Sequence, residues 1–403
     1  MFAHIPDYPG DPILSLMESF SRDSNAHKTN LGIGLYYDED GRIPVMRSVR
    51  HAADQLNAEP KPHTYLPMEG DAAYRQAVQE LVFGATSAAL RDARIATIQS
   101  VGGSGAIYLA ARFINAFLPA TEVWISDPTW DNHRVLLESA GLKVHTYPYY
   151  DAHNNAVKSD AMLATLGTLP AGGVVLLQPS CHNPTGCDLG VAQFDELVAL
   201  LKRRNLLPFV DMAYQGFGDG LDEDATLVRK LVDAGLQVIV SNSFSKNFSL
   251  YGERVGGLSI VCADAPTAAR VLGQMKSLVR QVYSSPPAFG ARIVAATLTN
   301  PTLASLWRAE LGTMRSRMKT MRGALREALE AAAPQVDFRY LTEQRGMFSY
   351  TGLSAAEVDA LRETNSIYLI RSGRICVAGL NKANIGYVAQ SFADVVTRRT
   401  VAA

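Results

Sequence analysis

The chain has 403 residues, of which 47% are hydrophobic and 19% are charged. That composition is typical of a globular protein long enough for two domains, and it excludes a disordered or fibrous chain. The 38 Lys and Arg residues nearly balance the 39 Asp and Glu residues. We therefore expect neither a nucleic-acid nor a membrane partner, and small anionic substrates would have to be held by individually placed cations.

The four cysteines are too few for a disulfide framework and lack the spacing of zinc ligands. We expect them to be small buried residues in a reducing compartment, and we expect no metal site. The first residues lack the basic and then apolar pattern of a signal peptide, and no apolar run approaches the roughly 18 residues of a membrane span. The sequence thus predicts a cytoplasmic protein.

The N-terminal segment 1–43 is rich in Pro, Gly and Asp, and we expect it to form an arm and part of a small domain. From about residue 70 to 300, short apolar runs alternate with amphipathic stretches such as 193–204 and 226–234. This alternation predicts an α/β domain with a mostly parallel central sheet flanked by helices. The expected strands are 95–98, 123–126, 144–147, 174–178, 208–210, 238–241 and 257–261.

The pattern changes after residue 300. A stretch rich in Ala, Leu, Arg and Glu (303–332) predicts one long helix, and runs at 346–350, 367–370 and 374–377 predict short strands. Such a mixture is typical of a smaller α+β domain. The expected parts are the arm 1–43, a large domain 44–312 and a small C-terminal domain 313–403.

The most informative segment follows the strand 238–241 and reads Ser243-Phe-Ser-Lys246-Asn-Phe-Ser-Leu-Tyr-Gly-Glu-Arg254. A lysine that forms an imine must spend time deprotonated, and the hydroxyls of Ser243 and Ser245 with the guanidinium of Arg254 suit a phosphate dianion. Ser-x-x-Lys also occurs in penicillin-recognising acyl-transfer enzymes, but their Ser-Asp-Asn and Lys-Thr-Gly elements are missing here. On its own, a lysine such as Lys246 is better explained as a solvated surface charge, and only the other motifs of the chain reverse that interpretation.

A glycine-rich turn, Gly102-Gly103-Ser104-Gly105, connects the strand 95–98 to a helical stretch at 106–117. Backbone N–H groups and the helix dipole make such a turn an anion site. Its spacing fits neither the dinucleotide fingerprint nor the phosphate loop of nucleotide hydrolases. Taken alone, the turn also has a purely structural interpretation.

Asp211 closes the apolar run 206–210 and precedes Ala213-Tyr214-Gln-Gly-Phe. A carboxylate at the carboxyl end of a strand can pair with a protonated pyridine nitrogen and so make a heterocycle an electron sink. The simpler alternative is a helix cap.

Two more segments follow expected strands. In His182-Asn183-Pro-Thr-Gly, Asn183 can hydrogen-bond a phenolic oxygen, and the alternative is an ordinary turn. In Asp-Pro-Thr-Trp130-Asp-Asn-His133, Trp130 offers a flat face for stacking a heterocycle, and His133 can support Asp211. Each is also compatible with a core residue.

Together these motifs resemble the class I aminotransferases of fold type I, the aspartate and aromatic aminotransferase family. The resemblance extends from Gly10-Asp-Pro-Ile to Ser372-Gly-Arg374 and rests on Ser-x-Ser-Lys-Asn-Phe, His-Asn-Pro-Thr-Gly and Asp-x-Ala-Tyr-Gln-Gly-Phe. It implies a fold type I transferase that uses pyridoxal 5′-phosphate (PLP), held by the large domain 44–312. It also implies a ping-pong cycle in which Lys246, which carries the cofactor as a Schiff base, takes the substrate Cα proton once it is displaced.

By the same resemblance the catalytic residues are Lys246, Asp211 and Tyr214. The implied cofactor contacts are Gly103, Ser104, Trp130, Asn183, Asp211, Tyr214, Ser243, Ser245, Lys246, Arg254 and, from a second subunit, Tyr65. The implied substrate contacts are Arg374, Arg280, Gly34, Trp130 and Asn183. Arg374 would clamp the α-carboxylate, and Arg280 resembles the arginine that crosses from the neighbouring subunit to a dicarboxylate side chain. The resemblance therefore implies a homodimer with active sites at the subunit interface, although either arginine alone is compatible with a surface charge.

Within the family, segments such as Leu35-Tyr-Tyr, Ile43 and Leu66-Pro-Met-Glu-Gly resemble the aromatic branch. An apolar pocket contact favours a ring over a hydrated carboxylate by about 1–3 kcal/mol. Thr64, Gln281-Val and Arg371 depart from the branch pattern and leave the substrate ranking open.

The sequence thus predicts a transaminase acting on tyrosine and phenylalanine, and on aspartate and glutamate, with 2-oxoglutarate. The alternatives are an aspartate aminotransferase of broad specificity, another PLP reaction such as β-elimination or decarboxylation, and a cofactor-binding regulator. The last normally has a basic DNA-binding module, for which this sequence offers no basic extension.

Overall fold

The structure is a computed structural model that describes residues 1–402, apart from 3, 9, 60 and 61. The chain divides into two compact units, Pro44–Arg317 and Met1–Ile43 with Met318–Ala403. The last boundary lies between Arg317 and Met318 rather than between 312 and 313. Helix α12 (Pro301–Ala332) passes through it without a break, so no loop marks the division.

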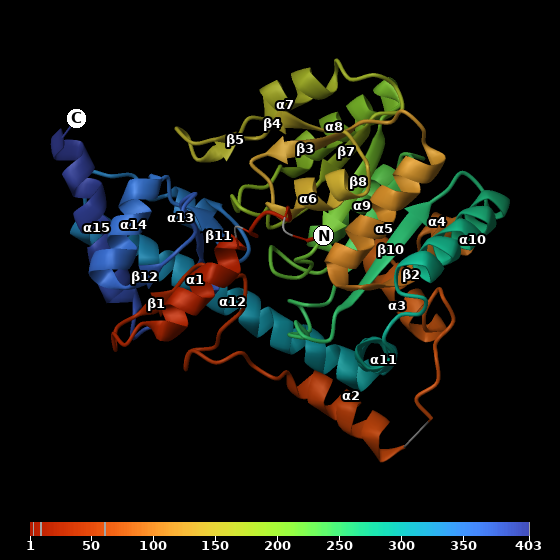
Figure 1. The fold of residues 1–403 in the computed structure, drawn as a ribbon, viewed down its shortest axis with the longest axis horizontal. Coiled ribbons are helices and arrows are strands. Elements are labelled where there is room, and N and C mark those ends of the chain that lie inside the picture. Colours follow the sequence, from red (N-terminus) through yellow and green to blue (C-terminus); the bar gives the residue numbers. More distant parts are fainter. Residues whose placement is uncertain (3, 9, 60–61, 403) are drawn as a thin grey trace. The chain divides into compact units, whose positions relative to one another are not determined.

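The larger unit, Pro44–Arg317, is built on a seven-stranded sheet (Figure 1). In sheet order its strands are β2 (Ile95–Val101), β10 (Val255–Val261), β9 (Val238–Ser243), β8 (Leu207–Met212), β7 (Val174–Leu177), β3 (Val123–Asp127) and β4 (Val144–Pro148). Only β10 runs antiparallel to its neighbours, so the predicted strands and the mostly parallel sheet are confirmed. A short hairpin, β5 (Tyr150–Asp151) and β6 (Ala156–Val157), follows β4.

Helices cover both faces of this sheet (Figure 1). On one face are α5 (Gly102–Phe117), α6 (Asn132–Ser139) and α10 (Ala265–Val282); on the other are α3 (Ala72–Phe83), α7 (Ser159–Leu166), α8 (Val191–Arg204) and α9 (Thr226–Asp233). The remaining elements are α2 (Arg47–Ala58), α4 (Ala88–Arg91), η1 (Glu223–Ala225) and α11 (Phe289–Thr299). Because the central strands are covered on both sides, they are mainly apolar up to their carboxyl ends, and β7, which reads Val-Val-Leu-Leu, is apolar and buried throughout.

The smaller unit joins the N-terminal arm to the C-terminal part of the chain. Its strand β1 (Thr29–Asn30) pairs in parallel with β12 (Ile367–Tyr368), and β11 (Phe348–Tyr350) pairs antiparallel with β13 (Arg374–Cys376). Its helices are α1 (Pro12–Arg22), α13 (Tyr340–Glu343), α14 (Ala355–Asn365), η2 (Val377–Gly379) and α15 (Ile385–Ala402). Local signals set the helix ends, since Asp11 caps α1, and Ser354 and Glu357 form a capping box on α14.

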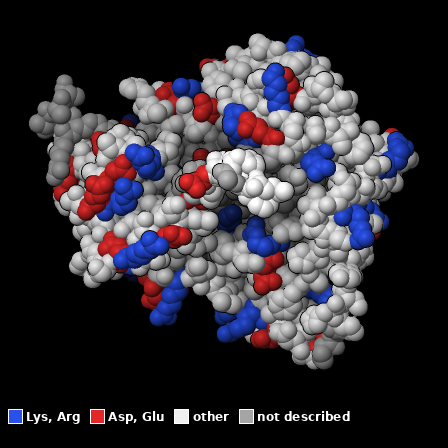
Figure 2. Space-filling view, viewed as in Figure 1, with Lys and Arg blue, Asp and Glu red and all other residues white. Residues whose placement is uncertain are grey.

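Charges of both signs are interspersed over the face of the molecule in Figure 2, without one large basic area. Among the described residues, no helix is long and apolar enough to cross a membrane, and no group of His, Cys, Asp and Glu has the arrangement of a metal site. The four cysteines are buried, and none forms a disulfide.

Candidate active site

The predicted reactive residues of the larger unit follow the carboxyl ends of its parallel strands. Asp211 is the penultimate residue of β8, and Ser243 is the last residue of β9, three positions before Lys246. Trp130 follows β3, and Asn183 follows β7. Because these four strands run parallel and neighbour one another, their ends meet at one edge of the sheet, which is where ligands of such sheets bind.

Asp211 is buried and held by two side chains. The Ser241 hydroxyl donates to its Oδ1 at 2.9 Å, and His133 Nε2 lies 3.1 Å from its Oδ2. An ionised carboxylate only accepts hydrogen bonds, so Nε2 is the donor in this pair, and His133 Nδ1 lies 2.7 Å from the Thr129 hydroxyl oxygen. The expected contact of His133 with Asp211 is confirmed, and the His133 and Trp130 ring centroids are 5.2 Å apart with the ring planes nearly perpendicular.

Lys246, Tyr214 and Asn183 form a second group. The half-buried Lys246 places its Nζ 5.1 Å from the centroid of the Tyr214 ring. Asn183 Nδ2 donates to the Tyr214 hydroxyl at 3.4 Å. The Asn183 backbone is fixed in turn by Gln178, which accepts from its N–H at 2.9 Å and donates to its carbonyl at 3.0 Å. A lysine, a phenol and an amide therefore face a common space beside Asp211's strand.

The start of α5 forms a cradle with the segment after β9. Gly102 has a φ of +67°, and a Cβ there would lie 2.4 Å from Arg254 Nη2, so only glycine allows the guanidinium this approach. A Cβ on Gly103 would meet the Cβ of Ser243 at 3.2 Å. Arg254 Nη1 donates to the Ser245 hydroxyl at 3.2 Å, and Ser104 lies in the first turn of α5.

These contacts gather a helix N-terminus, serine hydroxyls and a guanidinium, which is the donor set that a phosphate dianion requires. The carboxylate of Asp211 and the lysine amine supply partners for a pyridine nitrogen and a carbonyl carbon. The residues therefore fit PLP. The donors for the phosphate come from the start of α5 and the segment after β9, whereas the carboxylate for the pyridine nitrogen comes from β8.

Tyr65 and Arg280 stand apart from this group. Tyr65 is 95% exposed and makes no hydrogen bond within the described chain. Arg280, exposed in the last turn of α10, donates to the Ser284 hydroxyl. A single chain thus leaves both side chains at its surface.

Arg374 and Gly34 belong to the smaller unit. The buried Arg374 guanidinium lies 4.4 Å from the Phe348 ring centroid, and its Nη2 donates to the Gly32 carbonyl at 2.6 Å. Gly34 lies against the same ring, since a Cβ there would be 2.9 Å from Phe348 Cζ.

Sequence reasoning missed several residues that organise the site. Ser241 is opposite Asp211 in the pairing of β9 with β8, so it is found only once the strand order is known. The sequence indicates no separate role for His182 within the motif His182-Asn183-Pro-Thr-Gly. His182 is buried, lies 4.0 Å from the Tyr149 ring in a stacked arrangement, and hydrogen-bonds Ser126 and Thr185. Burial and the nearby His133 lower the pKa of His182 to about 3, so its imidazole is neutral.

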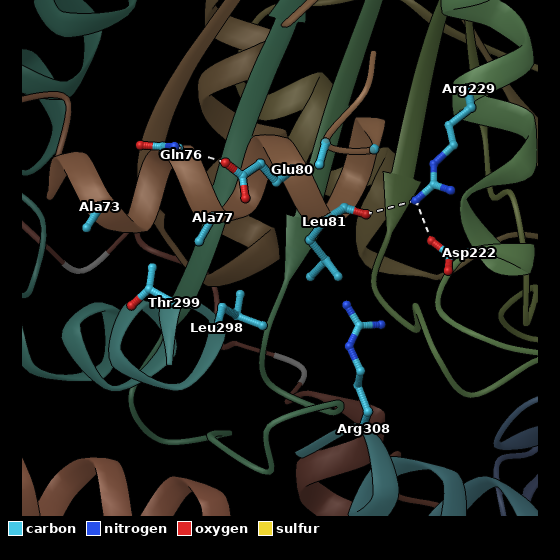
Figure 3. Close-up of a pocket in the computed structure, with 12 residues that line it drawn as sticks. Ala73, Gln76, Ala77, Glu80, Leu81, Asp222, Arg229, Leu298, Thr299 and Arg308 are labelled. Atoms are coloured by element: carbon cyan, nitrogen blue, oxygen red, sulfur yellow. Dashed lines mark hydrogen bonds and ion pairs between the residues drawn. The ribbon is translucent and has the colours of Figure 1, made fainter. Parts of the chain in front are cut away.

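A separate cavity of about 360 Å³ lies among α3, α9, α11, α12 and the loop that ends at Asp222, just before η1 (Figure 3). Arg229 on its wall donates to the Leu81 carbonyl at 3.3 Å and to Asp222 at 2.8 Å, and Gln76 donates to Glu80. These polar groups pair with one another, and none of the predicted site residues lines the cavity. It is therefore distinct from the candidate active site.

Known proteins resemble this chain along almost its whole length. Residues 26–392 match the family described as aminotransferase class I and II. A tyrosine aminotransferase of Klebsiella pneumoniae is 55% identical over 98% of this chain and 100% of the relative, and an aspartate aminotransferase of Pseudomonas aeruginosa is 47% identical over the same shares.

The solved structures agree. An aromatic-amino-acid aminotransferase from Burkholderia pseudomallei, covalently bound to pyridoxal phosphate, matches with a TM-score of 0.96 and 48% identity over 98% of this chain and 99% of that one. The match to the family, the fold and a strand-edge site that fits the cofactor lead to the same conclusion. The chain belongs to the class I and II aminotransferases and is a PLP-dependent transaminase.

Proposed function

We propose that this enzyme transfers the amino group between tyrosine or phenylalanine and 2-oxoglutarate, and that it also accepts aspartate and glutamate. The observation that carries the proposal is the higher identity to a tyrosine aminotransferase, 55%, than to an aspartate aminotransferase, 47%. Ile43, one of the residues by which the chain resembles the aromatic branch, is an apolar side chain with 43% of its surface exposed. The arginine at position 280 supports retention of dicarboxylic substrates.

In this proposal the larger unit, Pro44–Arg317, is the cofactor domain. Arg254, Ser243, Ser245 and the start of α5 with Gly103 and Ser104 hold the phosphate. When bound, PLP supplies an electron sink that stabilises negative charge at the substrate Cα. Trp130 would stack on the ring, and the Asn183 amide and the Tyr214 hydroxyl would hydrogen-bond its phenolic oxygen.

Proton movements are assigned to two residues. Asp211 keeps a proton on the pyridine nitrogen, because a buried carboxylate stabilises a neighbouring cation, and Ser241 and His133 hold it in place. The amine of Lys246 takes the proton from the substrate Cα and returns one when the product forms. Arg374 binds the α-carboxylate with its planar fork, beside Gly34.

The decisive test of the substrate class is kcat/KM for phenylalanine and for aspartate, each with 2-oxoglutarate. We expect the ratio to favour phenylalanine by about ten-fold or more, the worth of one or two apolar contacts. A ratio that favours aspartate would identify the aspartate aminotransferase alternative. Release of pyruvate or ammonia without a 2-oxo acid would instead identify an elimination.

We also propose a homodimer whose subunits share each active site. The support is that Tyr65 and Arg280 are exposed and make no contact with Lys246 or Asp211 in the described chain. The test mixes two variants, Lys246→Ala and Arg280→Leu, and assays aspartate transamination after subunit exchange. If the sites are shared, mixed dimers contain one site with both native residues and regain activity. If each subunit uses its own Arg280, mixing restores nothing.

The same proposal places the enzyme in the cytoplasm. Its support is the set of four buried cysteines, none of which forms a disulfide, as is usual for a reducing compartment. Fractionation of cells that produce the chain, followed by an activity assay of each fraction, tests it, and activity confined to a membrane or extracellular fraction would refute it.

A further inference from the structure

A buried arginine fixes the strand that lies beside Arg374. Arg322, on α12, is 2% exposed. Its guanidinium donates to the carbonyl oxygens of Leu341 at 2.9 Å and Gly346 at 3.0 Å, to the Ser349 hydroxyl at 2.8 Å, and to the carbonyl of Phe348. Bonds from a charged donor are about twice as strong as neutral ones, so this set holds the backbone before and within β11.

Arg374 lies on β13, the strand that pairs with β11. In the antiparallel pair β11–β13, Phe348 is opposite Cys376 and Tyr350 is opposite Arg374. Phe348 and Arg374 are therefore diagonal neighbours on the same face, close enough for an aromatic ring and a long side chain to touch. The guanidinium lies 4.4 Å from the ring centroid, and both side chains are buried.

Gly34 lies against the Cζ edge of the Phe348 ring. A Cβ at this position would lie 2.9 Å from Phe348 Cζ, closer than real Cβ contacts occur. The carbonyl of Gly32, two residues earlier, accepts from Arg374 Nη2. The segment 32–34 thus bounds the ring and binds one edge of the guanidinium.

We propose that Phe348 is a positioning residue for substrate binding: held by Arg322 and bounded by Gly34, its ring fixes the plane of the Arg374 guanidinium for the α-carboxylate. This inference rests on the proposed role of Arg374. A flexible arginine loses rotamer entropy when it binds, and a guanidinium already oriented in the free enzyme loses less. Every amino-acid and 2-oxo-acid substrate has this carboxylate, so the effect is common to all of them.

The test compares KM and kcat in the holoenzyme for two variants that disturb the ring in opposite ways. Phe348→Leu removes the ring, and Gly34→Ala pushes it. We expect each variant to raise KM by roughly ten-fold, as loss of a buried cation–π contact implies, with a smaller change in kcat. The factor should be equal for phenylalanine and aspartate. The inhibition constant of 3-phenylpropionate, a carboxylate without an amino group, should rise by the same factor.

Phe392→Leu is the matched control, because Phe392 is 3% exposed in the hydrophobic core of the same unit. It loses the same atoms and a similar stability, but KM should stay within about two-fold of the native value. If Phe348→Leu does not fold, Gly34→Ala tests the inference alone. An unchanged KM in the ring variants, or an equal rise in Phe392→Leu, overturns it.

The substrate class does not affect this test. The ratio of variant to native KM is measured with whichever amino acid the native enzyme transaminates. Failure of the proposed function would appear in the native enzyme, and failure of this inference would appear only in the ratios.

Discussion

The two units hold their functional side chains in different ways. In the larger unit, Asp211 and Lys246 are placed by adjacent parallel strands of a seven-stranded sheet, so the backbone itself sets their positions. In the smaller unit, Arg374 lies on a strand of three residues in a two-stranded sheet, and its guanidinium is oriented by a ring and a backbone carbonyl. The proposed proton transfers require fixed positions of the Asp211 carboxylate and the Lys246 amine, whereas binding of a carboxylate by Arg374 requires a fixed plane of its guanidinium. Changes in the first region should therefore lower kcat, and changes in the second should mainly raise KM.

The largest effect is expected at Lys246. Lys246→Ala removes the amine to which we assign binding of the cofactor and transfer of the Cα proton, and we expect kcat to fall by at least about 10⁴-fold. The rate of 2-oxo-acid formation from phenylalanine measures it. Lys202→Ala is the control, since that lysine is on the exposed end of α8 and donates to the Ala234 carbonyl. Substantial turnover by Lys246→Ala would contradict the proposed role of the lysine.

Asp211→Asn tests the charge without changing the shape. The amide can still accept from Ser241, but it no longer stabilises a protonated pyridine nitrogen, and we expect kcat to fall by about 10²–10⁴-fold with KM less affected. Single-turnover rates and kcat measure the loss. Asp127→Asn, at the exposed end of β3, is the control. A near-native rate for Asp211→Asn would show that the buried carboxylate only orders the strand ends.

Arg374→Ala should have a different signature from both. We expect kcat/KM to fall by about 10²–10³-fold for phenylalanine and aspartate alike, mainly through KM, because both have an α-carboxylate. Arg371→Ala removes an exposed cation three residues earlier that pairs with Asp359 at 2.9 Å, and it should leave kcat/KM nearly unchanged. If Arg374→Ala lowered kcat without raising KM, the two units would no longer differ in the kinetic constant that they affect.

Much of the larger unit could be predicted from the sequence because its buried parallel strands are continuous apolar runs. The residues after them, Asp211, Asn183 and Lys246, are conspicuous for the same reason: polar side chains follow apolar segments. Strand order is not visible in this way, so Ser241 opposite Asp211 had to come from the structure.

The smaller unit was harder to predict. Its strands β12 and β13 have two and three residues, too few for a period to show, and each was expected to be longer. The residues that surround the Phe348 ring beside Arg374 come from α12, β11 and the N-terminal arm, which lie far apart in the chain. Only the family resemblance assigns Tyr65 and Arg280 to the active site of a second subunit, because an exposed side chain in a single chain does not indicate that a partner subunit contacts it.

The smallest expected effect concerns the stability of the sheet edge rather than the rate. His182 has a pKa of about 3 in the folded protein and about 6.5 when unfolded, because burial disfavours its charged form. Below about pH 6.5 the unfolded chain binds a proton that the folded chain does not, so folding loses stability as the pH falls.

At pH 5 this loss amounts to about 2 kcal/mol. We therefore expect the native enzyme to lose about 2 kcal/mol more than His182→Gln between pH 7.5 and 5, measured by urea unfolding of the holoenzyme. Carboxylates that titrate in this range affect both proteins equally and cancel in the comparison. His153→Gln, in the exposed turn between β5 and β6, should follow the native pH dependence. If the free energy of unfolding depends on pH in the same way for the native enzyme and for His182→Gln, the folded protein accommodates a charged imidazole at position 182. The strand ends of the larger unit would then hold their side chains less rigidly than we infer from the comparison with Arg374.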